Sequence, residues 1–336
     1  MKKRGIGVGS MWYGIGNTAL PNPAGAFVEL LDDGTAIVLT GCADIGQGSD
    51  TTLAQIAAQE LGIKYEDVRV ASADTAISPD AGATSASRQT YISGNAVRLA
   101  AEEAKQELLR EAAAIFHKPV EELELKEGRV WLAGAPTERS VKELIRRCRA
   151  QGKLTLGSGR FNPETTQLDS DTGQGVPYAT YAFATQAAEV EVDTITGEVE
   201  LLKIYAAHDV GKAINPQNVI GQVQGGCAMG IGYALMEEVK VEEGVIKNPH
   251  LSGYIIPTTL DMPEIDVTIV ESLEETGPFG AKGVGEPALI PTAAAIANAI
   301  YDAIGIRFTS LPITAEKIVA ALKEKNEGSA RNGNSD

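Results

Sequence analysis

Apolar and polar residues alternate along the chain in patterns that predict short strands and several longer helices. Ala26–Leu30 and Ala36–Thr40 are apolar runs on either side of an Asp-Gly turn, which predicts a β-hairpin. Ser49–Leu61 carries apolar residues on one face and is followed by a glycine, as a helix often is. Further elements expected in this half are a strand at Asp67–Ala71 and helices at Asn95–Phe116 and Val141–Cys148.

The second half of the chain begins with another hairpin. Ala182–Val192 and Val199–Ala206 flank a loop that contains a glycine. Gln217–Glu238 is predicted to be helical although glycines interrupt it, and each glycine lowers helix propensity by about 1 kcal/mol. Close packing or a nearby ligand must therefore compensate. The remaining elements expected are a hairpin at Val239–Lys247, a strand at Val267–Val270, and helices at Thr292–Ile304 and Ala315–Lys323.

These elements predict an α+β fold of two α/β subdomains with mixed sheets and packed helices. Gly152–Pro177 is rich in Gly, Ser, Thr, Asp and Asn, and is the best candidate for a boundary. We therefore expect one subdomain at 1–155 and a second at 156–322. Residues 323–336 are polar and without periodicity, so we expect them to form a disordered tail.

Composition and charge narrow the possible partners. The chain has 45 acidic and 29 basic residues, a formal net charge of −16, which repels phosphate backbones and anionic lipid. We therefore expect no nucleic acid partner. No run approaches 18 uninterrupted apolar residues, so we expect no membrane span. Three widely separated cysteines argue against a disulfide framework and fit a reducing compartment, so we expect a cytoplasmic protein.

Common catalytic signatures are missing from the sequence. There is no GxGxxG, GxxxxGK[ST], HExxH or GxSxG motif, and no CxxC pair that would ligate zinc or an iron–sulfur cluster. The histidines His117, His208 and His250 are distant from one another in sequence. The candidates that remain are polar residues in glycine-rich segments.

Two such segments lie in the first half. Gly41–Gly48 contains Gln47 and precedes a predicted helix, whose N-terminus favours an anion such as phosphate. Pro79–Gln89 carries small residues, hydroxyls and Arg88. Taken singly, the first is equally well explained as a plain turn with a solvated glutamine. The second is better explained as an ordinary Ser/Thr-rich loop.

The other two segments lie in the second half. Gly221–Gly226 places two glutamines among glycines, which suits either a ligand contact or a tight helix crossing. Gly280–Pro287 ends a glycine-rich loop on Glu286, which Pro287 restricts to an extended backbone. A desolvated glutamate in such a loop can act as a general base, whereas spacing alone favours a solvated charge.

Together and in this order, the four segments resemble the C-terminal half of the molybdopterin-binding subunit of the molybdenum hydroxylases, the xanthine dehydrogenase and aldehyde oxidoreductase family. The resemblance covers about Arg4 to Ala320. The motifs on which it rests are DIGQG at 44–48, TSASRQ at 84–89, NPQNVIGQVQGG at 215–226 and GAKGVGEP at 280–287. The opening of the chain resembles the smaller of two molybdopterin chains in split enzymes of this family.

The resemblance implies a role for each motif. Glu286 would be the general base. Residues expected to bind the molybdopterin cofactor are Gly46, Gln47, Gly48, Thr84, Ser85, Ala86, Ser87, Gln222, Lys282, Gly283 and Gly285. Substrate contacts are expected from Tyr13, by stacking on the substrate ring, and from Ala86 and Arg88. No side chain is expected to ligate the metal, because the pterin dithiolene of the cofactor holds it.

The resemblance also implies cofactors and partner chains. The cofactor would be a molybdopterin dinucleotide with molybdenum, which carries a sulfido or selenido ligand. Partners would be a larger molybdopterin subunit, an iron–sulfur subunit and an FAD subunit. The reaction would be hydroxylation of a small aromatic N-heterocycle with water as the oxygen source, and nicotinate to 6-hydroxynicotinate is favoured.

Two alternatives stay open. The same chemistry can act on a purine such as xanthine or on an aldehyde, because the partner chain supplies part of the substrate pocket. An alternative of another class is a non-catalytic scaffold or cofactor-insertion partner that retains the fold. The intact Glu286, Gln47 and Gln222 speak against that alternative, because a scaffold has no need for a carboxylate in a tight glycine loop.

Overall fold

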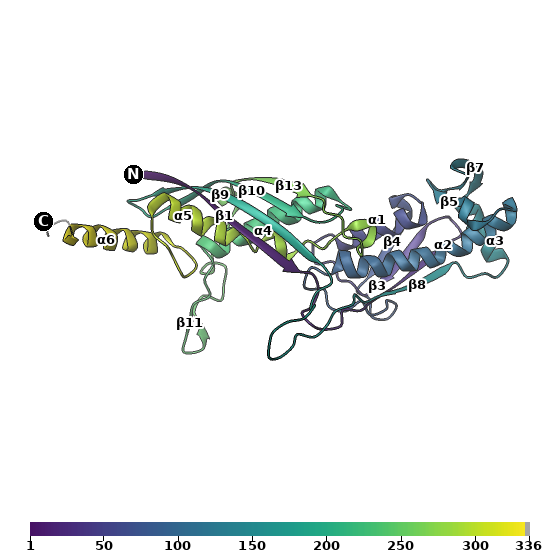
Figure 1. Cartoon of the computed structure of the whole chain (residues 1–336), viewed down its shortest axis with the longest axis horizontal. Helices are drawn as coiled ribbons and strands as arrows, with labels where there is room; N and C mark the ends of the chain where they lie inside the picture. Colours follow the sequence, from purple (N-terminus) through teal and green to yellow (C-terminus); the bar gives the residue numbers. More distant parts are fainter. Residues whose placement is uncertain (333–336) are drawn as a thin grey trace.

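The computed structural model of the protein describes residues 1–332 and shows an elongated molecule of two lobes (Figure 1). Each lobe has its own core of buried apolar side chains. The first core draws its residues from 15–182 and the second from 188–318. The arrangement of helices on mixed sheets is the α+β class that the sequence predicts.

The first lobe is built on a four-stranded sheet with the order β4-β3-β2-β8. Its strands are β2 (Ala24–Leu30), β3 (Ala36–Thr40), β4 (Val68–Ser72) and β8 (Leu156–Phe161). Strand β2 is antiparallel to β3 and β8, and β3 is parallel to β4. Helices α1 (Ser49–Leu61) and α2 (Gly94–Phe116) pack on this sheet.

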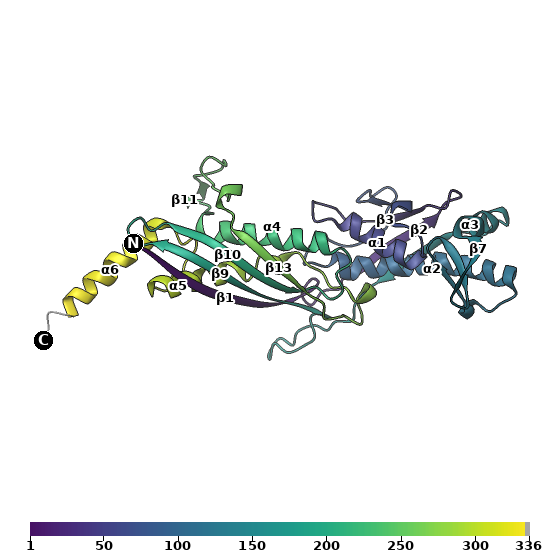
Figure 2. The ribbon, with the colours of Figure 1, turned by 90° about the horizontal axis from the view of Figure 1, so that it is seen from above.

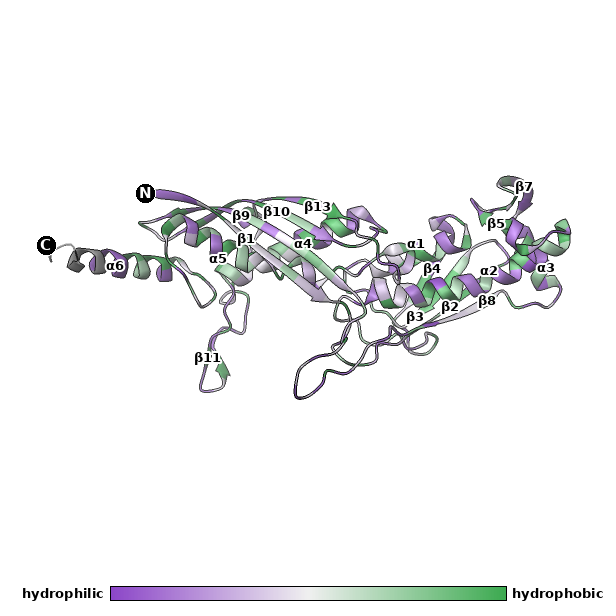
Figure 3. Ribbon diagram, in the orientation of Figure 1, coloured by the Kyte–Doolittle hydropathy of each residue, from purple (hydrophilic) through white to green (hydrophobic). Residues whose placement is uncertain are grey.

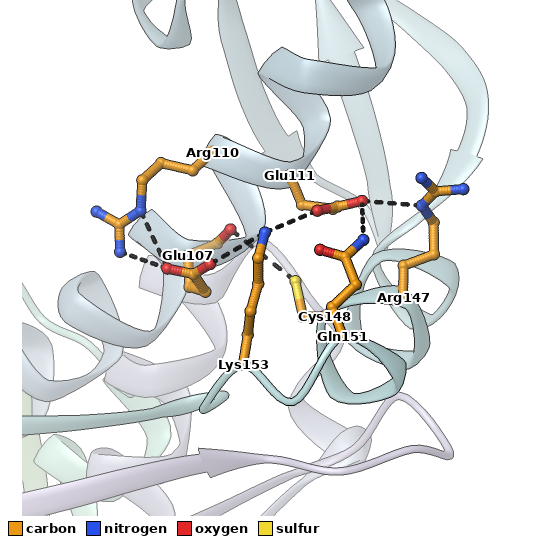
Figure 4. A network of polar contacts seen from close by, with 7 residues as sticks. All are labelled: Glu107, Arg110, Glu111, Arg147, Cys148, Gln151 and Lys153. Carbon is orange, nitrogen blue, oxygen red and sulfur yellow. Dashed lines mark hydrogen bonds and ion pairs between the residues drawn. The ribbon is translucent and has the colours of Figure 1, made fainter.

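A small substructure closes the far end of this lobe. Its strands are β5 (Leu123–Lys126), β6 (Arg129–Leu132) and β7 (Ala135–Ser140), followed by helix α3 (Val141–Ala150). Buried Glu111 on α2 accepts hydrogen bonds from Arg147, Gln151 and Lys153, at 2.9, 3.1 and 2.9 Å (Figure 4). This network fastens α3 and the segment after it to α2.

The second lobe is built on a sheet with the order β1-β9-β10-β13. Its strands are β1 (Lys2–Gly14), β9 (Tyr181–Asp193), β10 (Val199–Asp209) and β13 (Glu264–Val270). Neighbouring strands are antiparallel except β10 and β13, which are parallel. Helices α4 (Pro216–Leu235) and α5 (Thr292–Ile304) pack on one face of this sheet (Figure 2).

Glycines in β1 bring α5 directly onto the sheet. Gly5, Gly7 and Gly9 face α5, and a Cβ at any of them would overlap backbone atoms of Pro291, Ala299 or their neighbours. Ile6 and Val8 point to the opposite face and are exposed. The glycine pattern of β1 is therefore a packing surface and not a turn.

The remaining elements are short or peripheral. A hairpin of β11 (Val241–Glu242) and β12 (Val245–Ile246) projects from the second lobe (Figure 1). One π-turn, η2 (Gln89–Ser93), leads into α2. The single turns of 3-10 helix are η1 (Tyr65–Asp67), η3 (Val120–Glu122), η4 (Thr259–Asp261), η5 (Pro278–Gly280) and η6 (Glu286–Ala288). Helix α6 (Ala315–Asn332) ends the described chain.

The structure corrects the predicted subdomain boundaries. Strand β1 pairs with β9, so the N-terminal residues belong to the second sheet, whereas β8 pairs with β2 and belongs to the first. The boundary at 155/156 therefore does not follow the sheets, because strands join partners that are distant in sequence. Helix α6 continues past Lys323, so the expected disordered tail is wrong for 323–332. Residues 333–336 lie outside the described residues.

By length and composition, one helical segment of the described chain, Glu286–Ile304, is apolar enough to cross a membrane. Half of it is buried inside the protein. Its main part is α5, which is largely hydrophobic (Figure 3) and packs on β1 and β9. Ile296, Ala299 and Ile300 of α5 are fully buried in the second core, which accounts for the apolar composition of the segment.

Candidate active site at the junction of the lobes

A cavity of about 400 Å³ lies where residues of the two lobes meet, and all four glycine-rich segments border it. The first lobe contributes the start of α1 and residues 84–90, and the second contributes residues from 210–229 and the loop that carries Glu286. Predicted site residues in its lining are Gln47, Thr84, Ser85, Ser87, Arg88, Gln222, Lys282, Gly285 and Glu286. The others, Tyr13, Gly46, Gly48, Ala86 and Gly283, lie outside that lining.

Glu286 sits in the turn η6, half-buried at the cavity wall. The hydroxyl of Ser87 donates a hydrogen bond to Glu286 Oε2, and the backbone N–H of Glu286 donates to Ser87 Oγ at 3.1 Å. This reciprocal pair fixes one carboxylate oxygen of Glu286. Tyr13 also interacts with the Glu286 carboxylate, so Ser87 and Tyr13 both hold it at the cavity wall.

The backbone at Ser87 is held in an unusual conformation. Ala86 and Ser87 both have φ of 53°, in the left-handed region that non-glycine residues rarely adopt. Two such residues cost on the order of 1–3 kcal/mol each. The glycine loop accommodates them: a Cβ at Gly283 would overlap the Ser87 carbonyl, and one at Gly285 would lie 3.1 Å from Ser87 Oγ. The sequence feature that brings Ser87 to Glu286 is therefore the glycine spacing of the loop.

Tyr13, at the end of β1, lies beside this pair. Burial, followed by the negative charge of Glu286, raises the pKa of Tyr13 to about 12, while a hydrogen bond with Ser87 acts in the opposite direction. The phenol therefore stays protonated near neutral pH. Tyr13 lies next to the Glu286 carboxylate and outside the cavity lining, and its expected stacking on the substrate ring stays a prediction.

The DIGQG loop is largely self-contained. The Asp44 carboxylate accepts hydrogen bonds from the N–H groups of Gly46 and Gly48, at 2.9 and 3.3 Å. The Gln47 amide donates to Ala43 O and Ser49 Oγ, and its Oε1 accepts from Ile45 N at 2.6 Å. Gln47 thus borders the cavity with both amide hydrogens already used in ordering the loop.

Two residues predicted to contact ligands form bonds within the protein. Arg88 is 1% exposed, and its two terminal nitrogens donate to four backbone carbonyls at 2.6–3.0 Å. Lys282 is 7% exposed and bonds Asp209 Oδ2 at 2.7 Å. Arg88 Nε has no partner among the described residues, and the Lys282 ammonium has donors beyond this one bond. Both residues line the cavity, and their contacts with substrate and cofactor stay predictions.

Thr84 and Gln222 do present hydrogen-bonding groups to the cavity. Thr84 Oγ1 accepts from Ala43 N–H at 3.0 Å and from Gln89 Nε2 at 2.7 Å. Both partners are donors, so the hydroxyl hydrogen of Thr84 is left to donate to another acceptor. The Gln222 amide lines the cavity and has no hydrogen bond recorded among the described residues. A heterocycle with carbonyl and amino groups fits this set.

Sequence reasoning missed part of the cavity wall. Asn215 caps α4 by accepting from Asn218 N–H at 3.0 Å, and Pro216 follows it. Asn215 and Asn218 line the cavity, as do Ser49 and Thr52 at the start of α1. Two helix N-termini therefore meet at the cavity. The Asp44 carboxylate already accepts from the Asp50 N–H at the start of α1, so the N-terminus of α4 is the one whose partial positive charge favours a phosphate. Asn215 followed by Pro216 is a common helix start, so the sequence did contain a signal for this part of the cavity wall.

Within the part of the chain that the structure describes, no cluster of three or more His, Cys, Asp or Glu side chains is placed to hold a metal ion. A metal at this site would have to be held by a bound cofactor. The Thr84 hydroxyl, the Gln222 amide and the N-terminus of α4 supply donors that a phosphorylated pterin needs. The residues present therefore fit such a cofactor.

Comparison with known proteins identifies the family. A family model described as a molybdopterin cofactor-binding domain matches residues 1–263. The chain is 34% identical over 323 residues to the putative xanthine dehydrogenase molybdenum-binding subunit XdhA of Escherichia coli, covering 94% of this chain and 42% of that protein. It is 33% identical to the 6-hydroxypseudooxynicotine dehydrogenase complex subunit gamma of Paenarthrobacter nicotinovorans, covering 89% and 38%.

Solved structures support the same family assignment. Quinoline 2-oxidoreductase from Pseudomonas putida 86 matches with a TM-score of 0.86 and 29% identity, over 96% of this chain and 42% of that one. The aldehyde oxidoreductase of Desulfovibrio gigas matches with a TM-score of 0.80 and 32% identity, over 96% and 33%. The chain belongs to the molybdopterin cofactor-binding domain family of the molybdenum hydroxylases, as the four motifs indicate. It spans about two fifths of the length of these curated relatives.

Proposed function

We propose that this chain is the molybdopterin-binding subunit of a multi-subunit molybdenum hydroxylase and contributes the general base of the reaction. The observation that carries the proposal is the position of Glu286. It lies at a cavity bordered by all four motif segments, with Oε2 of its carboxylate bonded to Ser87 and with Tyr13 beside it. Membership of the family supports an oxidoreductase role.

Different residues of this chain bind the cofactor and transfer the proton. When bound, molybdopterin supplies a molybdenum centre for the oxidation–reduction chemistry. Thr84 and Gln222 would hold the polar groups of the cofactor, and the N-terminus of α4 would favour its phosphates. The Glu286 carboxylate takes the proton from the water that provides the oxygen, and Ser87 keeps the carboxylate in the orientation needed for that transfer.

For the substrate, we propose an aromatic N-heterocycle, with nicotinate converted to 6-hydroxynicotinate, as in a nicotinate dehydrogenase. Similarity to quinoline 2-oxidoreductase, whose name specifies an N-heterocycle, supports this class. Similarity to proteins named for xanthine and for aldehydes keeps those substrates as the second candidate. The order of assay is therefore nicotinate, then xanthine, then an aldehyde.

We further propose that the active assembly is cytoplasmic and contains a larger molybdopterin subunit, an iron–sulfur subunit and an FAD subunit. Relatives named as subunits support a multi-chain assembly. Exposed apolar side chains beside the cavity wall also support it. Met229 and Tyr233 on α4 and Ile255 beyond it are 64%, 58% and 59% exposed. A surface of this kind is typical of an obligate interface.

Affinity isolation of the chain from its host under anaerobic conditions tests the proposal. The isolate is analysed for co-purifying chains, molybdenum, iron and flavin, and then assayed with nicotinate, xanthine and an aldehyde. The proposal predicts molybdenum together with a larger chain, iron and FAD. A chain that purifies alone and without molybdenum would overturn it in favour of a scaffold or cofactor-handling role.

A further inference from the structure

A chain of three buried polar residues lies under the Glu286 turn, in a core that is otherwise apolar. Gln186 on β9 is fully buried, as is Thr292 at the start of α5, and His208 on β10 is 1% exposed. Gln186 Nε2 lies 2.8 Å from the carbonyl of Ala288 and 3.1 Å from His208 Nε2. Thr292 Oγ1 lies 2.7 Å from Gln186 Oε1.

The chemistry of these groups sets the direction of each bond. The Ala288 carbonyl can only accept, so the amide nitrogen of Gln186 must face it. The second hydrogen of that nitrogen then points to His208 Nε2, which accepts, and the imidazole is neutral with its hydrogen on Nδ1. Gln186 Oε1 is left to accept from the Thr292 hydroxyl. Every polar atom of the Gln186 side chain is thus used.

Ala288 belongs to the same turn as Glu286. Ala288 N–H donates to Gly285 O at 3.1 Å, and Leu289 N–H donates to Glu286 O at 3.1 Å. Pro287 has no N–H to contribute. The Gln186 bond is therefore a side-chain link between this turn and the central strand β9. On the other side of the turn, Gly226 of α4 fits against Ala288, where a Cβ would overlap it.

We propose that Gln186 is a positioning residue for Glu286: it fixes the Glu286–Ala288 turn to β9 and so fixes the carboxylate relative to the cavity. This proposal rests on the proposed function, because it takes Glu286 as the general base. A positioned base loses efficiency steeply when it is displaced, and an error of about 1 Å can cost about a hundredfold in rate. His208 and Thr292 hold Gln186 in the orientation that makes this link.

The test replaces Gln186 by Met, which has a similar volume and cannot donate to Ala288. Thr292→Val is the graded comparison: it removes one of the two groups that orient Gln186 and keeps the donor to Ala288, so its effect should lie between those of wild type and Gln186→Met. Both variants are expressed in the complete assembly. Amide hydrogen exchange of residues 285–290 is measured beside kcat, KM and molybdenum content. If Gln186→Met does not fold, the combined variant Q186M/H208L/T292V replaces the whole network by apolar side chains.

The proposal predicts that Gln186→Met increases amide exchange in 285–290 by at least about tenfold, since the turn opens locally. It also predicts that kcat falls by about tenfold or more with a much smaller change in KM, while molybdenum content stays. Unchanged exchange in 285–290 would overturn the proposal, whatever the turnover. Glu286→Gln is measured in parallel: if it leaves turnover intact, the proposed function fails and not this link.

Discussion

Ser87 and Glu286 are 199 positions apart in the sequence and form a reciprocal hydrogen-bonded pair across the junction of the two lobes. The Ser87 hydroxyl donates to the Glu286 carboxylate, and the Glu286 N–H donates to the Ser87 oxygen. One partner belongs to a loop of the first lobe and the other to the glycine loop of the second. The pair therefore couples the relative position of the lobes to the orientation of the candidate base.

Ser87→Ala removes the donor to the Glu286 carboxylate. Without that bond the carboxylate is no longer held in one orientation, and a misplaced general base loses rate steeply. We therefore expect kcat to fall by about tenfold or more, with a much smaller change in KM. Ser85→Ala is the control, because Ser85 lines the same cavity and does not contact Glu286. An unchanged kcat would show that the pair does not position the base.

Arg88→Lys separates a structural role from substrate binding. The guanidinium donates hydrogen bonds to four backbone carbonyls in a buried site, and a lysine cannot reach all of them. We expect the free energy of unfolding to fall by about 2–4 kcal/mol, measured by chemical denaturation. Arg98→Lys, at a partly exposed ion pair with Glu102, should change it by less than about 0.5 kcal/mol. Normal stability with weakened substrate binding would instead assign Arg88 to the substrate.

Because His208 is buried, we expect the free energy of unfolding to fall in acid. Burial lowers the pKa of His208 from 6.5 to about 4. The unfolded chain therefore binds a proton between these pH values that the folded chain does not, and the stability falls as pH drops from 6.5 to about 4. The full effect is about 3 kcal/mol.

The measurement compares unfolding at pH 7 and pH 4.5 for the wild-type chain and His208→Leu. The variant loses the contact with Gln186 at every pH and loses the proton linkage, so its stability should fall less between the two values. Equal losses in the two proteins would mean that His208 does not titrate as its burial requires.

Glu111 is the centre of the charge network at the far end of the first lobe (Figure 4). Hydrogen bonds from Lys153, partly offset by burial, together with those from Arg147 and Gln151 lower the pKa of Glu111. Glu111→Gln keeps the shape and removes the charge. We expect it to lower the free energy of unfolding by about 1 kcal/mol, because the bonds from Arg147 and Lys153 lose their charge assistance while both cations stay partly exposed to water. Glu121→Gln, at an exposed position, is the control. Turnover per folded molecule should stay normal, because the network is remote from the cavity.

The regular elements could be predicted because their pattern is local. The helices at Ser49–Leu61 and Thr292–Ile304 begin and end at the predicted residues, since apolar spacing and a following glycine define them. Strand β1 could not be found in this way. Its inward positions are glycines, and both its partner strand and the helix that it contacts lie far along the chain.

The same limit applies to the site. The glycine-rich motifs marked the segments that meet at the cavity, including Glu286. The motifs do not show which groups each side chain contacts in the folded protein. Arg88 donates to backbone carbonyls of two separate loops, and Lys282 bonds Asp209 at the end of β10. Such pairings depend on tertiary contacts that spacing along the chain does not contain.

The most direct test of Glu286 as the general base is the turnover of the complete assembly with Glu286→Gln, measured beside its molybdenum content. The substitution keeps the shape of the side chain, including an acceptor for the Ser87 hydroxyl, and removes the base. We predict that turnover falls by at least about a hundredfold, the usual contribution of a positioned general base, while molybdenum content is unchanged. Near-normal turnover at normal molybdenum content would contradict it and remove Glu286 from the reaction.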